Sequence, residues 1–290
     1  MIVVTAASGQ LGRLVIASLL KRVPAQQVVA AVRDVAKAQD LAALGVQVRH
    51  ADYDDAASLD AAFDGARKVL LISSNQVGRR LPQHRNVIDA AARAKVALLA
   101  YTSILRADSS PLQLALEHRE TEAAIRASGL ASTFLRNSWY LENYTANLAP
   151  ALAHGEMKGA SGEGRVAAAA RADYADAAVA VLLSETTPQA IYELGGELPF
   201  TRAQLAAEVA RQSGKAVHYQ NLPQAEYRAF LLSVGLPEGL ANALADADAQ
   251  TANGALDNAG DTLSKLIGRP ATTLAAAVEA GLRQPAGAAH

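Results

Sequence analysis

Strand-like and helix-like stretches alternate along the first half of the chain. The strand-like runs are IVVT (2–5), VVAAV (28–32), VQVRH (46–50), KVLLIS (68–73), ALLAYT (97–102) and STFLR (132–136). Several runs are apolar on both faces, which is typical of strands in a parallel sheet covered by helices on each side. Apolar residues at three- and four-residue spacing follow the first five runs, within 11–20, 35–44, 56–63, 82–94 and 114–128. The alternation predicts an α/β fold, a Rossmann-type doubly wound parallel sheet.

The rhythm changes after residue 136. NSWYLENY (137–144) is rich in aromatic residues, although the chain as a whole has only 4% of them. We interpret GASGEG (159–164) as a turn, and mostly short amphipathic helices follow from residue 201. These patterns predict a second, smaller and mostly helical C-terminal lobe on the substrate side. The expected boundaries are 1–136 plus about 157–185 for the nucleotide-binding domain, and 137–156 plus about 186–290 for the lobe.

Composition excludes several kinds of chemistry. With 51% apolar and 19% charged residues, the 290-residue chain can bury a sizeable core. A net charge of −1 leaves no electrostatic footprint for nucleic acid or an anionic membrane. Without cysteine there is no disulfide, thiolate metal site or iron–sulfur cluster, and we expect no metal. The sequence opens on a strand-like run without a charged leader, and no apolar run approaches the roughly 20 residues of a membrane-spanning helix, so we expect a cytoplasmic protein.

The first strand runs into the turn TAASGQLG (5–12), which opens a helix. In a doubly wound fold this turn binds a dinucleotide pyrophosphate on backbone N–H groups, and the alternative is a purely structural turn. Gly9 would allow the backbone to approach phosphate, and Gly12 would let the helix pack closely. The spacing would be G-x-x-G-x-x-G if Ala6 were glycine. A positive φ at Ala6 would cost roughly 1–2 kcal/mol, whereas a negative φ would need only room for its methyl group, and the sequence does not decide between them.

The second strand ends in AAVRD (30–34), which places Arg33 where NAD-specific folds carry an acidic residue. A guanidinium there pairs with a 2′-phosphate and stacks on adenine, so the sequence favours NADP(H) over NAD(H). Lys37 lies one turn further on. Two alternatives stay open: Arg33 is an ordinary exposed arginine, or Asp34 takes the acidic role if the register slips by one residue.

The usual catalytic pair of short-chain dehydrogenases is absent. None of the eight tyrosines is followed by lysine four residues later. In the helix expected to carry that pair, His118 and Glu122 have the same spacing. They could relay a proton, or they could form an ordinary pair on the helix surface.

A set of blocks, in order along the chain, carries a family resemblance. They are TAASGQLG, AAVRD, ADYDD, LLISS, PQHRNVIDAA, AYTS, EHRETE, FLRNSWYLENY, RADYADAA, SVGLPEGLA and LSKLIGRP. The chain thereby resembles the NmrA-like branch of atypical short-chain dehydrogenases, nearly from end to end. It departs from that family at Ala6, and at Ser8, where threonine is more usual; Ser8 keeps a hydroxyl able to cap the helix or contact phosphate.

The resemblance implies an NADPH-dependent two-electron reduction of quinones by direct hydride transfer, without flavin or metal. An electron-poor quinone needs little acid assistance, which is compatible with the missing Tyr–Lys pair. Two other activities within the same scaffold stay open: a non-catalytic NADP(H)-sensing regulator, and a reductase of dyes or other electron-poor aromatic compounds. A homodimer is a further expectation.

The resemblance also implies the site residues. The cofactor-binding residues would be Ala6, Ser8, Gly9, Gln10, Leu11, Gly12, Arg33, Ser73, Ser74 and Asn137. The substrate pocket would be formed by Trp139, Tyr140, Asn143 and Tyr144. Asn137, Tyr140 and His118 are the candidate catalytic residues, and the sequence does not single out one of them.

Overall fold

The computed structural model describes residues 1–283, and the chain divides into two compact units. Unit 1 comprises residues 1–108, 116–137 and 171–193. Unit 2 comprises residues 109–115, 138–170 and the chain from residue 194 onward. Both units therefore draw on separate stretches of the sequence.

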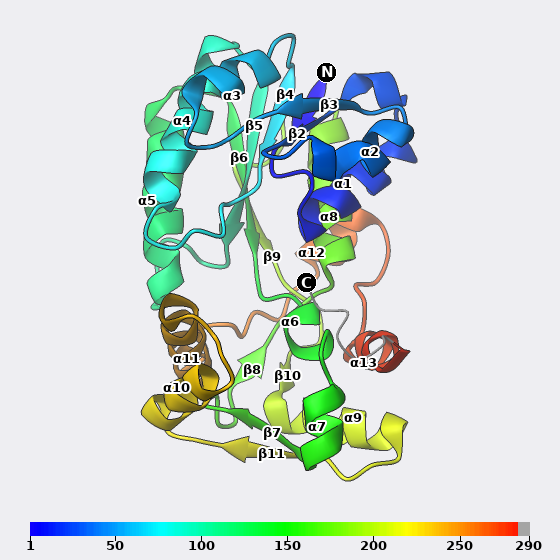
Figure 1. The fold of residues 1–290 in the computed structure, drawn as a ribbon, viewed down its shortest axis with the longest axis vertical. Coiled ribbons are helices and arrows are strands. Elements are labelled where there is room, and N and C mark those ends of the chain that lie inside the picture. Colours follow the sequence, from blue (N-terminus) through cyan, green and yellow to red (C-terminus); the bar gives the residue numbers. More distant parts are fainter. Residues whose placement is uncertain (284–290) are drawn as a thin grey trace. The chain divides into compact units, whose positions relative to one another are not determined.

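Unit 1 is built on a seven-stranded sheet in the order β3-β2-β1-β4-β5-β6-β9 (Figure 1). The strands are β1 (Ile2–Val4), β2 (Val28–Val32), β3 (Gln47–His50), β4 (Lys68–Leu71), β5 (Leu98–Ile104), β6 (Ser132–Asn137) and β9 (Ile191–Leu194). The pairs from β3 through to β6 are parallel. This confirms the predicted doubly wound sheet, with strand bounds within a few residues of the expected ones.

The order of the strands reverses next to β1, because β2 lies on one side of it and β4 on the other. In open α/β sheets, ligands bind outside the carboxyl ends of the strands at such a point. The chain that leaves β1, β2 and β4 at this edge carries the turn 5–12, Arg33 and Ser73, and Asn137 is the last residue of β6. The topology alone therefore gathers these residues at one edge of the sheet.

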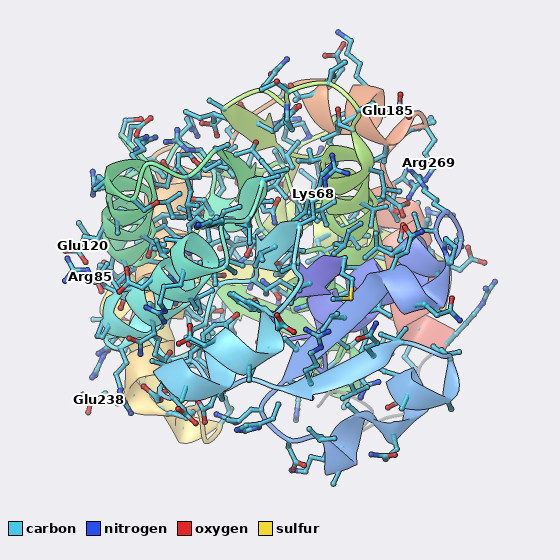
Figure 2. All side chains as sticks on the ribbon, turned by 90° about the horizontal axis from the view of Figure 1, so that it is seen from above. Lys68, Arg85, Glu120, Glu185, Glu238 and Arg269 are labelled. Atoms are coloured by element: carbon cyan, nitrogen blue, oxygen red, sulfur yellow. The ribbon has the colours of Figure 1, made fainter. Side chains whose placement is uncertain are left out.

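Helices cover both faces of the sheet (Figure 1). One face carries α1 (Gln10–Leu20) and α8 (Arg171–Leu183), and the other carries α3 (Ala56–Ala62), α4 (Arg80–Arg93) and α5 (Gln113–Ala127). Leu19 of α1 and Ile125 of α5 are fully buried, whereas Arg85 of α4 and Glu120 of α5 point away from the protein (Figure 2). Apolar side chains on both faces of the strands are thus removed from water, as their unbroken apolar runs predicted.

The stretch 35–44, expected as one helix, forms two short pieces. They are the 3₁₀ turn η2 (Ala36–Ala38) and the helix α2 (Gln39–Ala43), and a further 3₁₀ turn, η1 (Ala25–Gln27), precedes β2. Only Ala38 and Leu41 of this stretch are buried. Two buried side chains give a single turn of helix little apolar surface to pack on, so the segment stays irregular.

Unit 2 contains two small sheets and seven helices among the residues that the structure describes. β7 (Glu156–Gly159) pairs in parallel with β11 (His218–Asn221), and β8 (Arg165–Val166) pairs antiparallel with β10 (Phe200–Thr201). The helices are α6 (Glu142–Thr145), α7 (Ala149–His154), α9 (Arg202–Ser213), α10 (Gln224–Ser233), α11 (Glu238–Ala252), α12 (Thr262–Ile267) and α13 (Leu274–Arg283). The stretch 160–164 contains a turn, as predicted, with the Gly164 N–H donating to the Ser161 carbonyl over 2.8 Å. Within residues 1–283, no helix is both long and apolar enough to span a membrane.

A buried ion-pair network fixes the end of β6. The Glu122 side chain is fully buried on α5 and accepts from Arg136 Nε at 2.8 Å and Arg136 Nη2 at 2.6 Å. Arg136 also contacts Asp108 at 2.7 Å and Glu193 at 2.9 Å. The Arg136 guanidinium thereby connects three parts of unit 1, namely α5, β9 and the chain that follows β5. Arg136 is the residue directly before Asn137.

We expect Glu122→Ala to lower the free energy of unfolding by about 3–5 kcal/mol, because it leaves the Arg136 guanidinium buried without its main partner. Urea unfolding measures the loss. Arg93→Ala is the matched control, since it removes an exposed pair with Asp60 and should cost no more than about 1 kcal/mol. Equal losses for the two variants would contradict a structural role for the buried network.

Candidate functional site

The turn after β1 closes on itself through a hydrogen bond from the Gly9 N–H to the Ala6 carbonyl, 3.0 Å long. Ala6 has a φ of 47°, so it adopts the left-handed conformation that usually needs glycine. Of the two conformations that the sequence left open for Ala6, the structure therefore has the one with positive φ, which costs free energy. The turn keeps its closed form in spite of that cost.

Gly12 lets α1 approach this turn closely. A Cβ atom at Gly12 would lie 2.6 Å from the Ala6 carbonyl oxygen and 2.6 Å from the Ala7 Cα, which no side chain tolerates. Gly9 is the N-cap of α1, so no side chain caps the helix from that position, and its first turn has no acidic residue. The first N–H groups of a helix lack partners within the helix, so this end of α1 offers donors to an anion.

Arg33 directly follows β2, without a slip in register, and its side chain is exposed. Its guanidinium has no ion pair with any residue between 1 and 283, and its carbonyl accepts from His50 Nδ1 at 3.0 Å. Asp34 is engaged by its own loop, since its Oδ1 accepts from the Ala36 N–H at 3.0 Å and Lys37 lies 3.7 Å away. At the end of β2, Arg33 is thus exposed and without an ion pair among the described residues, whereas Asp34 is bonded within its own loop.

The two serines after β4 have different environments. The Ser74 hydroxyl is buried, donates to Gln83 Oε1 at 2.6 Å and accepts from the Gln76 N–H at 3.1 Å. Ser73 is half-buried, and its N–H donates to Thr102 Oγ1 at 2.9 Å. Ser74 thus holds the loop together, whereas Ser73 is the more accessible of the two.

Two buried histidines, His84 and His118, support the loop that contains Ser73 and Ser74. The Ser74 N–H donates to His84 Nε2 at 2.9 Å, and Arg80 Nη1 donates to His118 Nε2 at 3.1 Å. Because both Nε2 atoms accept, each neutral ring carries its proton on Nδ1. His84 Nδ1 then donates to Thr121 Oγ1 at 2.9 Å, and His118 Nδ1 donates to the Tyr101 hydroxyl at 2.7 Å.

Burial and the nearby Arg80 charge keep both rings neutral. They lower the pKa of His84 to about 3 and the pKa of His118 well below its ordinary value. A neutral His118, whose Nδ1 proton is bonded to Tyr101, is not a general acid at neutral pH. The surface pair considered for His118 and Glu122 is wrong, because both side chains are buried and each is bonded to other partners.

Asn137 lies at the carboxyl end of β6. It is buried, and its Oδ1 atom has no hydrogen-bond partner among the described residues. Leaving a buried amide oxygen unpaired costs about 1–3 kcal/mol, so such an atom points to a missing ligand donor. The sequence singled out this residue only by its place in a block.

The four predicted pocket residues lie in unit 2. Trp139 and Tyr140 are half-buried, and the Ala169 N–H donates to the Trp139 carbonyl over 3.1 Å. Asn143 is exposed on α6. Tyr144 is buried inside the unit, where its ring meets Phe200 edge-on at 5.8 Å and the Arg202 guanidinium at 5.0 Å.

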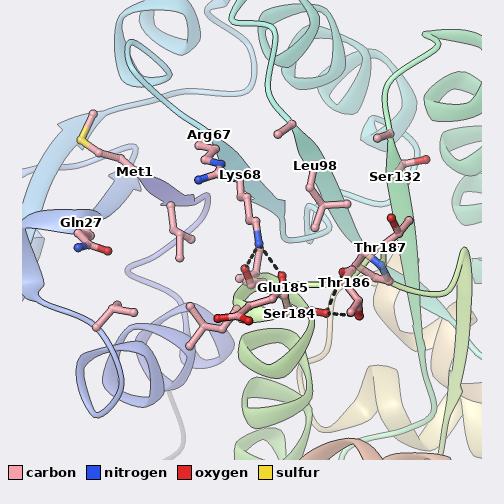
Figure 3. Close-up of a pocket in the computed structure, with 17 residues that line it drawn as sticks. Met1, Gln27, Arg67, Lys68, Leu98, Ser132, Ser184, Glu185, Thr186 and Thr187 are labelled. Atoms are coloured by element: carbon pink, nitrogen blue, oxygen red, sulfur yellow. Dashed lines mark hydrogen bonds between the residues drawn. The ribbon is translucent and has the colours of Figure 1, made fainter.

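A cavity of about 770 Å³ lies at the amino edge of the sheet of unit 1 (Figure 3), whereas the turn 5–12 and Arg33 lie at its carboxyl edge. It is lined by the starts of β1, β4, β5 and β6 and by the chain after α8. Lys68 Nζ donates there to the Leu182 carbonyl at 2.6 Å and the Ser184 carbonyl at 3.2 Å, which satisfies the end of α8. None of the predicted cofactor residues lines this cavity.

Several residues that shape the site were not predicted from the sequence. His84 lies in the predicted amphipathic stretch 82–94, Arg80 precedes it and Tyr101 lies in a predicted strand, but none of the three stood out as a site residue. Arg13, on the first turn of α1, donates to the Ser8 carbonyl at 2.9 Å and to Asp40. The roles of these residues follow from their contacts in three dimensions. A histidine within a predicted amphipathic helix is the one sequence signal that could have indicated a buried polar group.

The model of the NmrA-like family matches residues 1–275, and the chain belongs to that family. Quinone oxidoreductase 2 of Escherichia coli K12 is 56% identical over 278 residues, which cover 96% of this chain and 97% of that protein. The fold of the two proteins is also shared. The crystal structure of the NADPH-dependent quinone oxidoreductase from E. coli in complex with NADPH has a TM-score of 0.95 at 55% identity, and covers 98% of this chain and 100% of that one.

A second solved structure shares the fold at lower identity. Triphenylmethane reductase of Citrobacter sp., complexed with NADP(H), is 39% identical with a TM-score of 0.93. The alignment covers 97% of this chain and 100% of that one. Both likenesses extend over the two units and cover nearly all of this chain.

We expect Ala6→Gly to raise the free energy of unfolding by about 1 kcal/mol, because glycine adopts the left-handed conformation without strain. The variant should tighten NADPH by no more than about tenfold, the equivalent of ~1.4 kcal/mol. Urea unfolding and titration with NADPH measure the two effects.

Ala7→Gly is the control, since Ala7 is buried and does not have a positive φ, so it should lose stability. A change in Ala6→Gly from no binding to strong binding would show that the natural turn does not hold the cofactor.

Proposed function

We propose that the protein is an NADPH-dependent reductase that reduces quinones with two electrons by direct hydride transfer, without flavin or metal. The near end-to-end match to E. coli quinone oxidoreductase 2, at 56% identity, carries this proposal. The solved structure of the E. coli quinone oxidoreductase holds NADPH. The present chain keeps the features at the carboxyl edge of its sheet that such a cofactor needs.

Three features of unit 1 fit NADPH. We assign the pyrophosphate to the start of α1, formed by Gly9, Gln10, Leu11 and Gly12 beside Ala6 and the hydroxyl of Ser8, because the first N–H groups of a helix have no acceptor within it. The exposed Arg33 guanidinium suits the 2′-phosphate that distinguishes NADPH from NADH. The unpaired Oδ1 of Asn137 suits a donor such as the nicotinamide carboxamide.

NADPH, when bound, supplies the hydride that reduces the quinone. The chain's residues then have only to hold and orient the reactants, because an electron-poor quinone accepts hydride with little acid assistance. We assign orientation of the carboxamide to Asn137 and contact with the ribose side to Ser73. Ser74 supports this loop through His84.

In unit 2, we assign contact with the flat quinone ring to Trp139 and Tyr140, whose rings offer faces for stacking. Asn143 is a polar group for a quinone carbonyl. Tyr144 supports them from within the unit, where burial raises its pKa and keeps its hydroxyl protonated. His118, neutral and engaged at both nitrogens, is assigned to positioning and not to proton donation.

A second activity, reduction of dyes, is favoured by the 39% identity to triphenylmethane reductase over nearly the whole chain. It uses the same hydride donor and differs in the shape of the aromatic pocket. A regulator that binds NADP(H) without turnover is the third candidate from the sequence. Turnover of quinones and dyes separates the three.

We further infer that the protein works as a homodimer in the cytoplasm. Dependence on NADPH favours a cytoplasmic location, since cytoplasmic enzymes use the NADPH pool of the cell. Nucleic acid is not an expected partner at a net charge of −1. Light scattering after size-exclusion chromatography tests the dimer directly.

Purified protein mixed with NADPH and a simple benzoquinone should accelerate the loss of absorbance at about 340 nm above the uncatalysed rate, because bound NADPH and quinone react within one site. A triphenylmethane dye is assayed in parallel. NADP(H) binding without turnover of any quinone or dye would instead support the regulator.

The Arg33→Ala substitution should raise the KM for NADPH about 10- to 100-fold, because a charge-assisted hydrogen bond to phosphate contributes roughly 1.5–3 kcal/mol. The KM for NADH should change less than about twofold, since NADH lacks that phosphate. Arg22→Ala, an exposed arginine just after α1, controls for the loss of one positive charge. Equal losses for both cofactors would refute the role of Arg33.

A further inference from the structure

The segment 33–43 carries both cations near the end of β2, yet it is loosely built. Arg33 and Lys37 are exposed, and only Ala38 and Leu41 are buried between residues 33 and 43. Its internal hydrogen bonds join residues close in sequence, as in the Ala38 N–H to Val35 carbonyl bond of 3.1 Å. A surface segment of this kind needs an outside contact to keep a fixed position.

Arg13 supplies such a contact. From the first turn of α1, its Nε donates to the Ser8 carbonyl at 2.9 Å, and its Nη2 donates to the Lys37 carbonyl at 3.1 Å. Its Nη1 donates to the Asp40 carboxylate and, by that hydrogen bond first of all, lowers the pKa of Asp40. One guanidinium thereby connects the turn after β1 with both short helical pieces of the segment.

The two ends of this connection have separate tasks in the proposed site. Ser8 lies in the turn assigned to the pyrophosphate, and Lys37 lies one turn beyond the arginine assigned to the 2′-phosphate. Because the guanidinium is planar and bonds three acceptors, it fixes both the distance and the orientation of the segment 33–43 relative to the turn after β1. Holding both anchor points before the cofactor arrives reduces the ordering cost of binding.

We propose that Arg13 is a specificity-determining positioning residue: through the Lys37 carbonyl and Asp40 it holds the segment that meets the 2′-phosphate, and so favours NADPH over NADH. This inference rests on the proposed function. Arg13 and Asp40 are 36% and 59% exposed, so their pair contributes little to global stability. We expect the Arg13–Asp40 pair to affect the preference for NADPH over NADH.

A simpler role for Arg13 would be long-range attraction of phosphate by its charge. The two roles differ in what Asp40→Ala does. Removing the carboxylate adds net positive charge near the cofactor, so simple attraction predicts tighter NADPH binding. Loss of positioning predicts weaker NADPH binding, because Arg13 then holds the segment through the Lys37 carbonyl alone.

The decisive variant is the double substitution Arg13→Ala with Asp40→Ala, which leaves the net charge unchanged. Titration calorimetry with NADPH and NADH, and amide hydrogen exchange of the cofactor-free protein, are the measurements. We expect the Kd for NADPH to rise about tenfold, the Kd for NADH to change less than about twofold, and exchange within 33–43 to accelerate. The matched control is Arg93→Ala with Asp60→Ala, an exposed pair on α4 and α3 that should change neither Kd.

A double variant with unchanged discrimination, or an Asp40→Ala variant that binds NADPH more tightly, would overturn this role of Arg13. A wild-type protein that binds and oxidises NADPH in the same experiment would leave the proposed function intact. A wild-type protein that neither binds nor oxidises NADPH would overturn both.

Discussion

The close approach of α1 to the turn after β1 determines the geometry of the candidate site. Gly12 leaves no room for a side chain against the Ala6 carbonyl, so the helix end and the turn form one backbone surface. Ala6 adopts a left-handed φ to close that surface, at a cost that glycine would avoid. The chain therefore keeps the shape of a phosphate-binding turn while departing from its usual sequence.

The rest of the edge is held by buried polar groups. His84 and His118 are neutral because they are buried beside Arg80, and their fixed tautomers position the loop of Ser73 and Ser74. The Arg136 network does the same for the end of β6, where the Asn137 amide oxygen has no hydrogen-bond partner within residues 1–283. Rigid supports of this kind let a reductase orient its reactants without a dedicated acid.

The sequence predicted the doubly wound sheet well, because strands buried on both faces have a distinct apolar pattern. It also located the turn 5–12 and Arg33 by their places after β1 and β2. It could not decide the φ of Ala6, which depends on how the turn closes in space. The roles of Arg13, Arg80 and His84 depend on contacts 10 to 38 residues apart, and no local pattern records such contacts. The short strands β7, β8 and β10 of unit 2 escaped prediction, because two to four residues show no alternation.

A crystal structure of this protein grown with NADP⁺ would test the central claim most directly. We expect the pyrophosphate on the backbone N–H groups of the turn at Gly9–Gly12, the 2′-phosphate within hydrogen-bond distance of Arg33, and the carboxamide at Asn137. A cofactor bound elsewhere, such as in the cavity beside Lys68, or a 2′-phosphate out of reach of Arg33, would contradict the assignment of this edge as the cofactor site.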